Sequence, residues 1–318
     1  MRDNMLKMDE TEPARDVVVR DQPVVDFSHL TSPEQLAGIS RIEDVAVVVV
    51  PQSLAGAYAA ISVSDVAGTI YVPDRANVRV HTGSLAVGGD GLGTAADVLV
   101  VMGMLLITSP VTGPMPQRIY VIGSVLAPRG SESALGPALA GGSGGVSYYP
   151  YLDGQEIKVL SGQVRLSGAV LANEAGGLGD IMVAVGQVVV TGRITTLGFQ
   201  RVIVAGQLAA PADSRDVLEP GFQIQGQVGW YEGGDPRILS QDTTLGPDYF
   251  RLLDHPVNLV VFGDLTIAEG VTEAMMRDKI GSIILFGDAI VPPGLVAMLQ
   301  VLATDVFGDI RASGGLRN

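Results

Sequence analysis

A glycine-rich loop is the first feature of this sequence whose residue types and spacing could do chemistry. It reads Gly88-Gly-Asp-Gly-Leu-Gly93, which has the composition of a phosphate-binding loop. Such a loop needs a strand before it and a helix after it, whose N-terminus receives the phosphate. A calcium-binding nonapeptide loop would instead need several stacked copies. Residues 97–107 after the loop have the apolar run of a strand, so we predict a plain turn.

A second glycine loop stands at the corresponding place in a later repeat. It reads Ala175-Gly-Gly-Leu-Gly-Asp180. Two enlarged loops at equivalent positions of a repeat protein would emerge on the same edge, where a binding or lateral-contact surface is expected. We therefore predict an assembly or binding edge formed by Gly88, Asp90, Gly91, Gly176, Gly177 and Asp180.

Aspartates recur in the repeats at Asp97, Asp180 and Asp264. Stacked acids of this kind could bind a cation or act on a sugar, as in β-helical lyases. Aspartate also caps turns with its side-chain oxygens, and we favour this role. Aromatic pairs at 148–149 and 230–231 could form a stacking platform for a ligand. We expect them instead to fill a wide corner of a coil.

Other catalytic or metal-binding patterns are missing from the sequence. The three histidines, His29, His81 and His255, are far apart and lack ligand spacing. There is no cysteine, and the Gly142-Ser-Gly-Gly cluster has the composition of a loop rather than of the strand-to-helix nucleophile elbow of a serine hydrolase. We therefore predict no catalytic residues, no metal and no cofactor, and a protein that is not an enzyme.

The composition narrows the class of partner. The chain has 318 residues, a formal net charge of −14 and only 20 basic residues, which are scattered singly. A nucleic-acid partner is disfavoured, because phosphate binding needs clustered Lys and Arg. No apolar run approaches the roughly 20 residues of a membrane span. The N-terminus has no apolar signal-peptide region, so we expect a cytoplasmic protein with at most weak membrane contact through its N-terminal arm.

The elements that would position these residues are repeated strands. The stretch 98–128 consists of short apolar runs that contain Gly103 and Gly123, and similar stretches occur at 181–211 and 259–292. Gly83, Gly103 and Gly123 are spaced by 20 residues, and so are Gly186, Gly206 and Gly226. Residues 97–135 and 180–218 are identical at 13 of 39 positions without a gap. A fixed period filled with β-branched runs is typical of a solenoid.

We therefore predict a mainly β protein, a β-solenoid with coils of about 20 residues in three tandem modules and a few short helices. Its expected parts are a disordered or flexible arm (1–25), N-terminal strand–helix coils (26–75), solenoid module 1 (76–154), solenoid module 2 (155–235), a helical insertion (236–256), a mixed strand–helix module 3 (257–312) and a frayed tail (313–318).

Many of the predicted strands are apolar on both faces. Strands of this kind belong to sheets that are covered on both sides. The few predicted helices cannot cover a dozen coils, and uncovered apolar sheet is a sticky surface. Self-association through sheet faces or end coils is the simplest cover. The residues expected on these apolar faces are Val98, Val100, Met102, Ile181, Val183, Val202, Leu259 and Val261.

In organisation the chain resembles the polymer-forming β-solenoid proteins of bacteria, of which bactofilins are the cytoplasmic example. The resemblance covers about residues 45–228: a polar arm followed by stacked, Gly-punctuated Val/Ile coils. It implies head-to-tail assembly without nucleotide and no active site. We thus expect a self-assembling structural protein, whose partner is a second copy and possibly other proteins. The alternatives are an adaptor that binds partners without polymerising, and a β-helical carbohydrate-active enzyme or acyltransferase.

Overall fold

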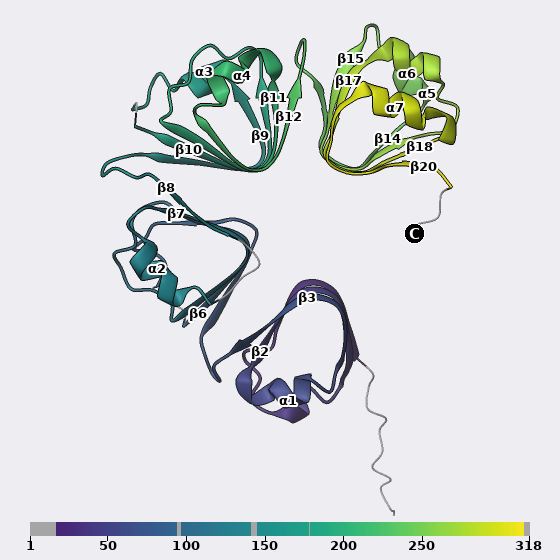
Figure 1. The fold of residues 1–318 in the computed structure, drawn as a ribbon. Helices are drawn as coiled ribbons and strands as arrows, with labels where there is room; N and C mark the ends of the chain where they lie inside the picture. The colour runs from purple at the N-terminus through teal and green to yellow at the C-terminus, as the bar shows by residue number, and fades with distance from the viewer. Residues whose placement is uncertain (1–16, 94–96, 141–144, 178, 315–318) are drawn as a thin grey trace, which may run out of the picture. The chain divides into compact units, whose positions relative to one another are not determined.

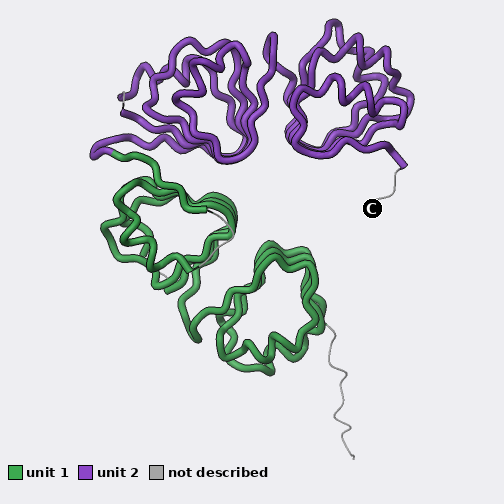
Figure 2. Tube along the Cα trace, viewed as in Figure 1, with its two compact units in different colours: residues 1–151 green, residues 152–318 purple. Residues whose placement is uncertain are grey.

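The computed structural model describes residues 17–93, 97–140, 145–177 and 179–314. The chain divides into two compact units, with the boundary between Tyr151 and Leu152 (Figure 2). Each unit contains two stacks of coils, which we number 1 to 4 along the chain. In every stack the strands are parallel and short helices or turns complete each coil (Figure 1). The predicted mainly β, solenoid-like arrangement is confirmed.

Unit 1 holds stacks 1 and 2. Stack 1 is a three-stranded parallel sheet closed by short helical turns; its elements are β1 (Val17–Asp26), η1 (Pro33–Gln35), β2 (Ile39–Pro51), η2 (Gln52–Leu54), α1 (Ala55–Tyr58) and β3 (Ser62–Val72). Stack 2 has five strands and one helix; its elements are β4 (Val78–Thr82), β5 (Leu85–Val87), β6 (Val98–Ile107), β7 (Arg118–Pro128), α2 (Glu132–Ala138) and β8 (Val146–Tyr149).

Unit 2 holds stacks 3 and 4. Stack 3 is a four-stranded parallel sheet; its elements are β9 (Ile157–Ser167), α3 (Gly168–Ala172), β10 (Ile181–Thr191), β11 (Arg201–Pro211), η3 (Ala212–Ser214), α4 (Arg215–Leu218) and β12 (Phe222–Tyr231). Stack 4 has two short strands in each coil; its elements are β13 (Arg237–Leu239), β14 (Thr243–Leu245), α5 (Pro247–Arg251), β15 (Val257–Val261), β16 (Leu265–Ile267), α6 (Glu273–Lys279), β17 (Ile280–Leu285), β18 (Ala289–Val291), η4 (Pro293–Leu295), α7 (Val296–Leu302), β19 (Ala303–Val306) and β20 (Ile310–Ala312).

A column of glycines sets the shape of stack 3. Gly162, Gly186, Gly206 and Gly226 pair in register across the four strands, and each has a positive φ. Each strand bends at this residue, and the backbones at the bend lie very close together. A Cβ atom on Gly206 would lie 2.2 Å from the carbonyl oxygen of Gly186. Only glycine tolerates both the positive φ and this close approach, which explains the 20-residue spacing seen in the sequence.

Stack 1 makes the same bend with aspartates. Asp21, Asp44 and Asp65 all have φ between 53° and 56°. Aspartate is among the few residues besides glycine that enter this region, because its short side chain can bond locally. Stack 1 therefore follows the bent-coil plan of the other stacks, although its sequence has no glycine column.

Each stack has its own apolar interior, and a second apolar layer lies between neighbouring stacks of a unit. In unit 1, Val47, Val49 and Val72 of stack 1 form one cluster with Val98 and Val100 of stack 2. In unit 2, a corresponding cluster joins stacks 3 and 4; it consists of Val189, Ala209, Tyr231, Val260, Phe262, Ile284 and Phe286. Strands that are apolar on both faces are thus covered within the same chain.

Two of the expected parts, the arm 1–25 and the helical insertion 236–256, differ from the structure, whereas the strand–helix coils expected at 26–75 are present. Residues 17–25 of the predicted arm belong to β1, which pairs with β2; residues 1–16 lie outside the described part. Residues 236–256 are no insertion, because β13 and β14 pair with β15 and β16 as the first coil of stack 4. Residues 26–75 complete a stack of the same plan as modules 1 to 3. Of the expected frayed tail, residues 315–318 are not described.

We expect Gly206→Ala to destabilise the chain by about 2–3 kcal/mol, because alanine must hold a positive φ and displace the backbone of Gly186. Urea unfolding measures this change. Gly234→Ala is the matched control, since a Cβ atom there meets no atom within 4 Å. Equal stabilities of the two variants would contradict the role assigned to the glycine column.

Candidate functional site

The first glycine loop is shaped by the coil stacked on it. The backbone N–H of Gly89 donates to Oγ of Ser109 at 2.8 Å, and a Cβ atom on Gly89 would lie 2.1 Å from the carbonyl oxygen of Pro110. Gly91 N–H donates to the carbonyl of Gly88 at 2.9 Å. Asp90 is exposed. These glycines allow a close approach of two loops, which confirms the prediction of a turn.

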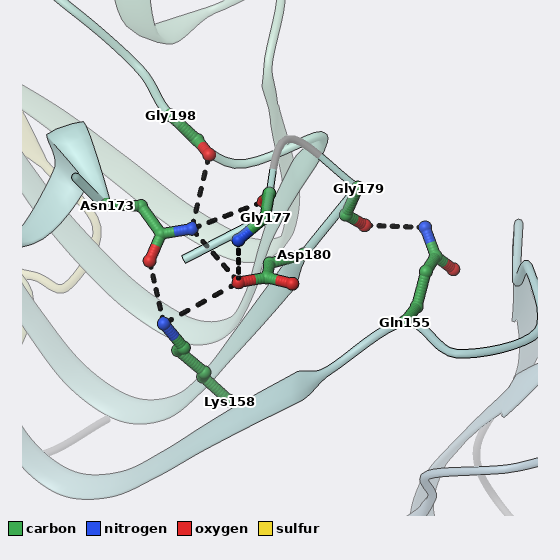
Figure 3. A network of polar contacts seen from close by, with 7 residues as sticks. All are labelled: Gln155, Lys158, Asn173, Gly177, Gly179, Asp180 and Gly198. Atoms are coloured by element: carbon green, nitrogen blue, oxygen red, sulfur yellow. Dashed lines mark hydrogen bonds and ion pairs between the residues drawn. The ribbon is translucent and has the colours of Figure 1, made fainter. Parts of the chain in front are cut away.

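The second glycine loop encloses a buried polar network, shown in Figure 3. Asp180 is only 6% exposed, although its neighbours Gly176 and Gly177 are exposed. Oδ2 of Asp180 accepts a hydrogen bond from the N–H of Gly177 at 3.0 Å and one from Nδ2 of Asn173 at 3.1 Å. Nζ of Lys158 lies 3.6 Å from the same oxygen. The loop is therefore folded around one carboxylate.

Asn173 is the centre of this network. It follows α3 in the left-handed conformation, with φ of 48° and ψ of 41°, which asparagine tolerates at a helix end. Its Oδ1 accepts a hydrogen bond from Nζ of Lys158 at 2.7 Å, and its Nδ2 also donates to the carbonyl of Gly198 at 3.3 Å. The side chain thus connects β9, the end of α3 and the next coil.

The polar atoms of the network mainly bind one another. Lys158 lies over the ring of Phe199, with Nζ 5.5 Å from the ring centroid. The hydrogen bond from Asn173, together with those from Gly177 and Lys158, holds the pKa of Asp180 below its usual range. A carboxylate held in this way remains ionised and engaged, which suits a structural brace rather than an acid or base.

The recurring aspartates accept backbone N–H groups, but Asp97 and Asp264 do so from an adjacent coil and not, as predicted, within their own turns. Oδ2 of Asp97 accepts a hydrogen bond from the N–H of Asn77 at 3.1 Å. In stack 4, Oδ1 of Asp264 accepts one from the N–H of Asp288, and Oδ1 of Asp288 one from Asp309, both at 2.9 Å. The described residues contain no group of three or more His, Asp or Glu that could hold a metal ion.

One aromatic residue at each module end is buried, but Tyr231 lies in the layer between stacks 3 and 4 and not, as predicted, in a corner of its coil. Tyr149 and Tyr231 are buried, and each hydroxyl donates to a backbone carbonyl, of Ile107 at 2.6 Å and of Val190 at 2.7 Å. Burial raises the pKa of both hydroxyls. Ser131 and Ser214 form a second pair of equivalent residues, and both are buried. The Oγ atom of each accepts a hydrogen bond from a backbone N–H of the preceding coil.

The predicted apolar faces are not surfaces. All of these residues except Met102 are buried, and Met102 is partly buried. Val98 and Val100 are covered by stack 1, and Met102 packs against the same cluster. Val202, Leu259 and Val261 point into the interiors of their own stacks. Ile181 and Val183 are buried as well. The expectation that these faces need a second chain is wrong, because the chain covers its sheets itself.

A column of glutamines lies beside the glycines of stack 3 and was not predicted from the sequence. Gln163, Gln187, Gln207 and Gln227 pair in register on the four strands, each directly after a glycine of the bend. Nε2 of Gln207 donates to Oε1 of Gln227 at 3.1 Å. Such amide ladders stabilise stacked parallel strands. The signal was a Gly-Gln-Val or Gly-Gln-Leu tripeptide repeated four times.

The two ends of stack 3 are open strand edges. Among the described residues, β9 pairs only with β10, and β12 pairs only with β11. Val159 and Gln163 on β9 are exposed. On the other end strand, β12, Nε2 of Gln225 is buried and has no hydrogen-bond partner among the described residues. These edges, rather than the glycine loops, are the candidate interface.

Comparisons with protein-family models, with curated proteins and with solved structures find no match to this chain. Within the described residues, no helix has the length and apolar character to span a membrane. The candidate site therefore has to be interpreted from its own geometry.

We expect Asp180→Asn to lower stability at pH 7, because it removes the charge that Lys158 and Asn173 engage. The folded-state pKa of Asp180 is lowered, so its stabilising contribution is present above about pH 4 and is lost as the pH falls through that lowered pKa. Urea unfolding should show a difference from the unsubstituted protein that narrows below about pH 4. Asp90→Asn, at an exposed carboxylate, should change stability little at either pH.

Proposed function

We propose that this protein is a non-enzymatic structural protein that self-assembles end to end through the open strand edges of stack 3. A second copy would add its β9 to β12 of the first and continue the parallel sheet. This proposal agrees with the head-to-tail assembly that the resemblance to bactofilins implies. In this proposal, strand edges and not apolar sheet faces form the contact between copies.

The observation that carries the proposal is the Gly-Gln pair that the inner and outer strands of stack 3 share at the bend. The end strand β9 carries Gly162-Gln163-Val164 and the end strand β12 carries Gly226-Gln227-Val228, both in register with the inner strands. At the bend, a copy stacked on β12 would therefore meet the same Gly-Gln pair that β11 and β12 present to each other. The glycine column and the glutamine column would continue in register.

Uncapped ends support the same proposal. Solenoids that remain soluble as single chains carry terminal repeats with a polar outer face. Stack 1 shows features that block edge pairing, because β1 carries Arg20, Asp21 and Pro23. Stack 3 carries no proline in either end strand, and of the two cations on β9, Lys158 is engaged by Asp180 and Asn173. An unprotected edge strand is a template for another chain.

In this proposal the partner is a second copy in the cytoplasm, and neither nucleic acid nor a cofactor takes part. The formal net charge of −14 and the absence of cysteine agree with that setting. An adaptor that binds other proteins through the same edges is the alternative, and the oligomeric state separates the two.

We expect the purified full chain at micromolar concentration to form filaments or sheets in negative-stain images, with matching growth in light scattering. The double substitution Val159→Lys and Gln163→Lys should prevent assembly, because lysines on an edge strand disfavour pairing with another chain.

Ala274→Lys is the matched control, since it adds the same kind of charge on an exposed position of α6 in an inner coil. It should assemble like the unsubstituted chain. A monodisperse monomer in physiological salt would rule out the proposed function and favour the adaptor.

A further inference from the structure

Stacks 3 and 4 meet along a seam formed by two columns of side chains. Four positions paired in register on β9 to β12 form the first column, and four positions paired in register on β13, β15, β17 and β19 form the second. The first column is Arg165, Val189, Ala209 and Gly229; the second is Ile238, Val260, Ile284 and Asp305. The middle of the seam is apolar and belongs to the cluster that joins the two stacks.

The seam narrows from its first coil to its last. In the first column the side chains become smaller from Arg165 to Gly229. At the narrow end β12 lies against β17 and β19, and a Cβ atom on Gly229 would be 2.5 Å from Cγ2 of Ile284. At the wide end a cavity of about 330 Å³ opens between the stacks and is lined by Arg165, Gln163 and Ile238.

The two ends of the seam carry opposite charges. Arg165 is exposed and has no hydrogen bond or ion pair with any described residue. Asp305 is partly buried, and its Oδ2 accepts a hydrogen bond from the N–H of Trp230 at 3.1 Å. No cation among the described residues pairs with Asp305. A charge lacking its counterpart thus stands at each end of an otherwise apolar seam.

We propose that Arg165 of one copy pairs with Asp305 of the next copy, so that the seam continues from chain to chain and fixes the register of assembly. This inference rests on the proposed end-to-end assembly and names the contact that directs it. The narrow end of the seam in one copy would thus stack against the wide end of the seam in the next copy.

The register of stack 3 places the two charges together. If Gly162 of the added copy stacks on Gly226, as the glycine column requires, Arg165 stacks on Gly229. Oδ2 of Asp305 lies 3.4 Å from the position of a Cβ atom on Gly229. Residues paired in register on parallel strands point the same way, so Arg165 of the added copy would point into the seam, one strand spacing of about 4.8 Å beyond Gly229 and the Asp305 carboxylate beside it. Complementary charges at an interface select register and suppress wrong pairings.

Charge reversal on the full chain tests this pairing. Arg165→Asp and Asp305→Arg, each alone, should raise the concentration needed for assembly by more than about tenfold, because like charges then meet at every junction. An equimolar mixture of the two variants should assemble at close to the unsubstituted concentration. In an alternating array of the two variants, every junction again joins one carboxylate and one guanidinium. Neither a folding defect nor an ion pair within one chain can produce this rescue.

Controls separate this inference from the proposed function. Arg193→Asp makes the same charge change on an exposed position of an inner coil and should assemble normally. Asp305→Asn keeps an acceptor for Trp230 and should weaken assembly if the charge matters. Two outcomes would refute the Arg165–Asp305 pairing while end-to-end assembly stands. In the first, the single variants assemble as well as the unsubstituted chain. In the second, the unsubstituted chain assembles but the mixture of folded variants does not. If the unsubstituted chain never assembles, the proposed function itself fails.

Discussion

One of the tightest backbone approaches in this fold is the stacking of one strand bend on the next. A Cβ atom on Gly123 would lie 1.8 Å from the carbonyl oxygen of Gly103, and the bend of stack 3 is almost as tight. Everything else in a coil is placed relative to this contact. It sets the register of the parallel strands, and the register in turn aligns the glutamines, the buried tyrosines and the seam residues in columns.

Much of the architecture could be predicted from the sequence, because the glycine spacing and the 83-residue offset between residues 97–135 and 180–218 reflect real structural equivalence. The offset also relates Ser131 to Ser214 and Ile107 to Val190, and the two members of each pair accept equivalent hydrogen bonds. The glycine spacing does not reveal stack 1 as a full stack, because aspartates replace the glycines at its bend. It does not reveal β13 and β14 either, because three-residue strands carry little periodicity.

The candidate site was harder to predict, because burial depends on neighbours that a sequence does not display. Strands such as β6 and β10 are apolar on both faces, and this pattern correctly indicates that both faces are covered. The cover, however, is the adjacent stack, as the contacts of Val98 and Val100 with stack 1 show. The partly buried contact of Asn173 with Lys158 leaves no sequence pattern, since the two residues are neighbours only after the first coil of stack 3 closes.

The parallel arrangement of every sheet gives each stack two different ends. A face made of β9 and a face made of β12 cannot be exchanged by a two-fold axis, so a copy added by parallel pairing is related to the first by translation along the stack. Contacts of this head-to-tail kind do not close on themselves unless a rotation brings the ends together. Polarity is therefore a property of the single chain, and any array built on these edges would inherit a distinct leading and trailing end.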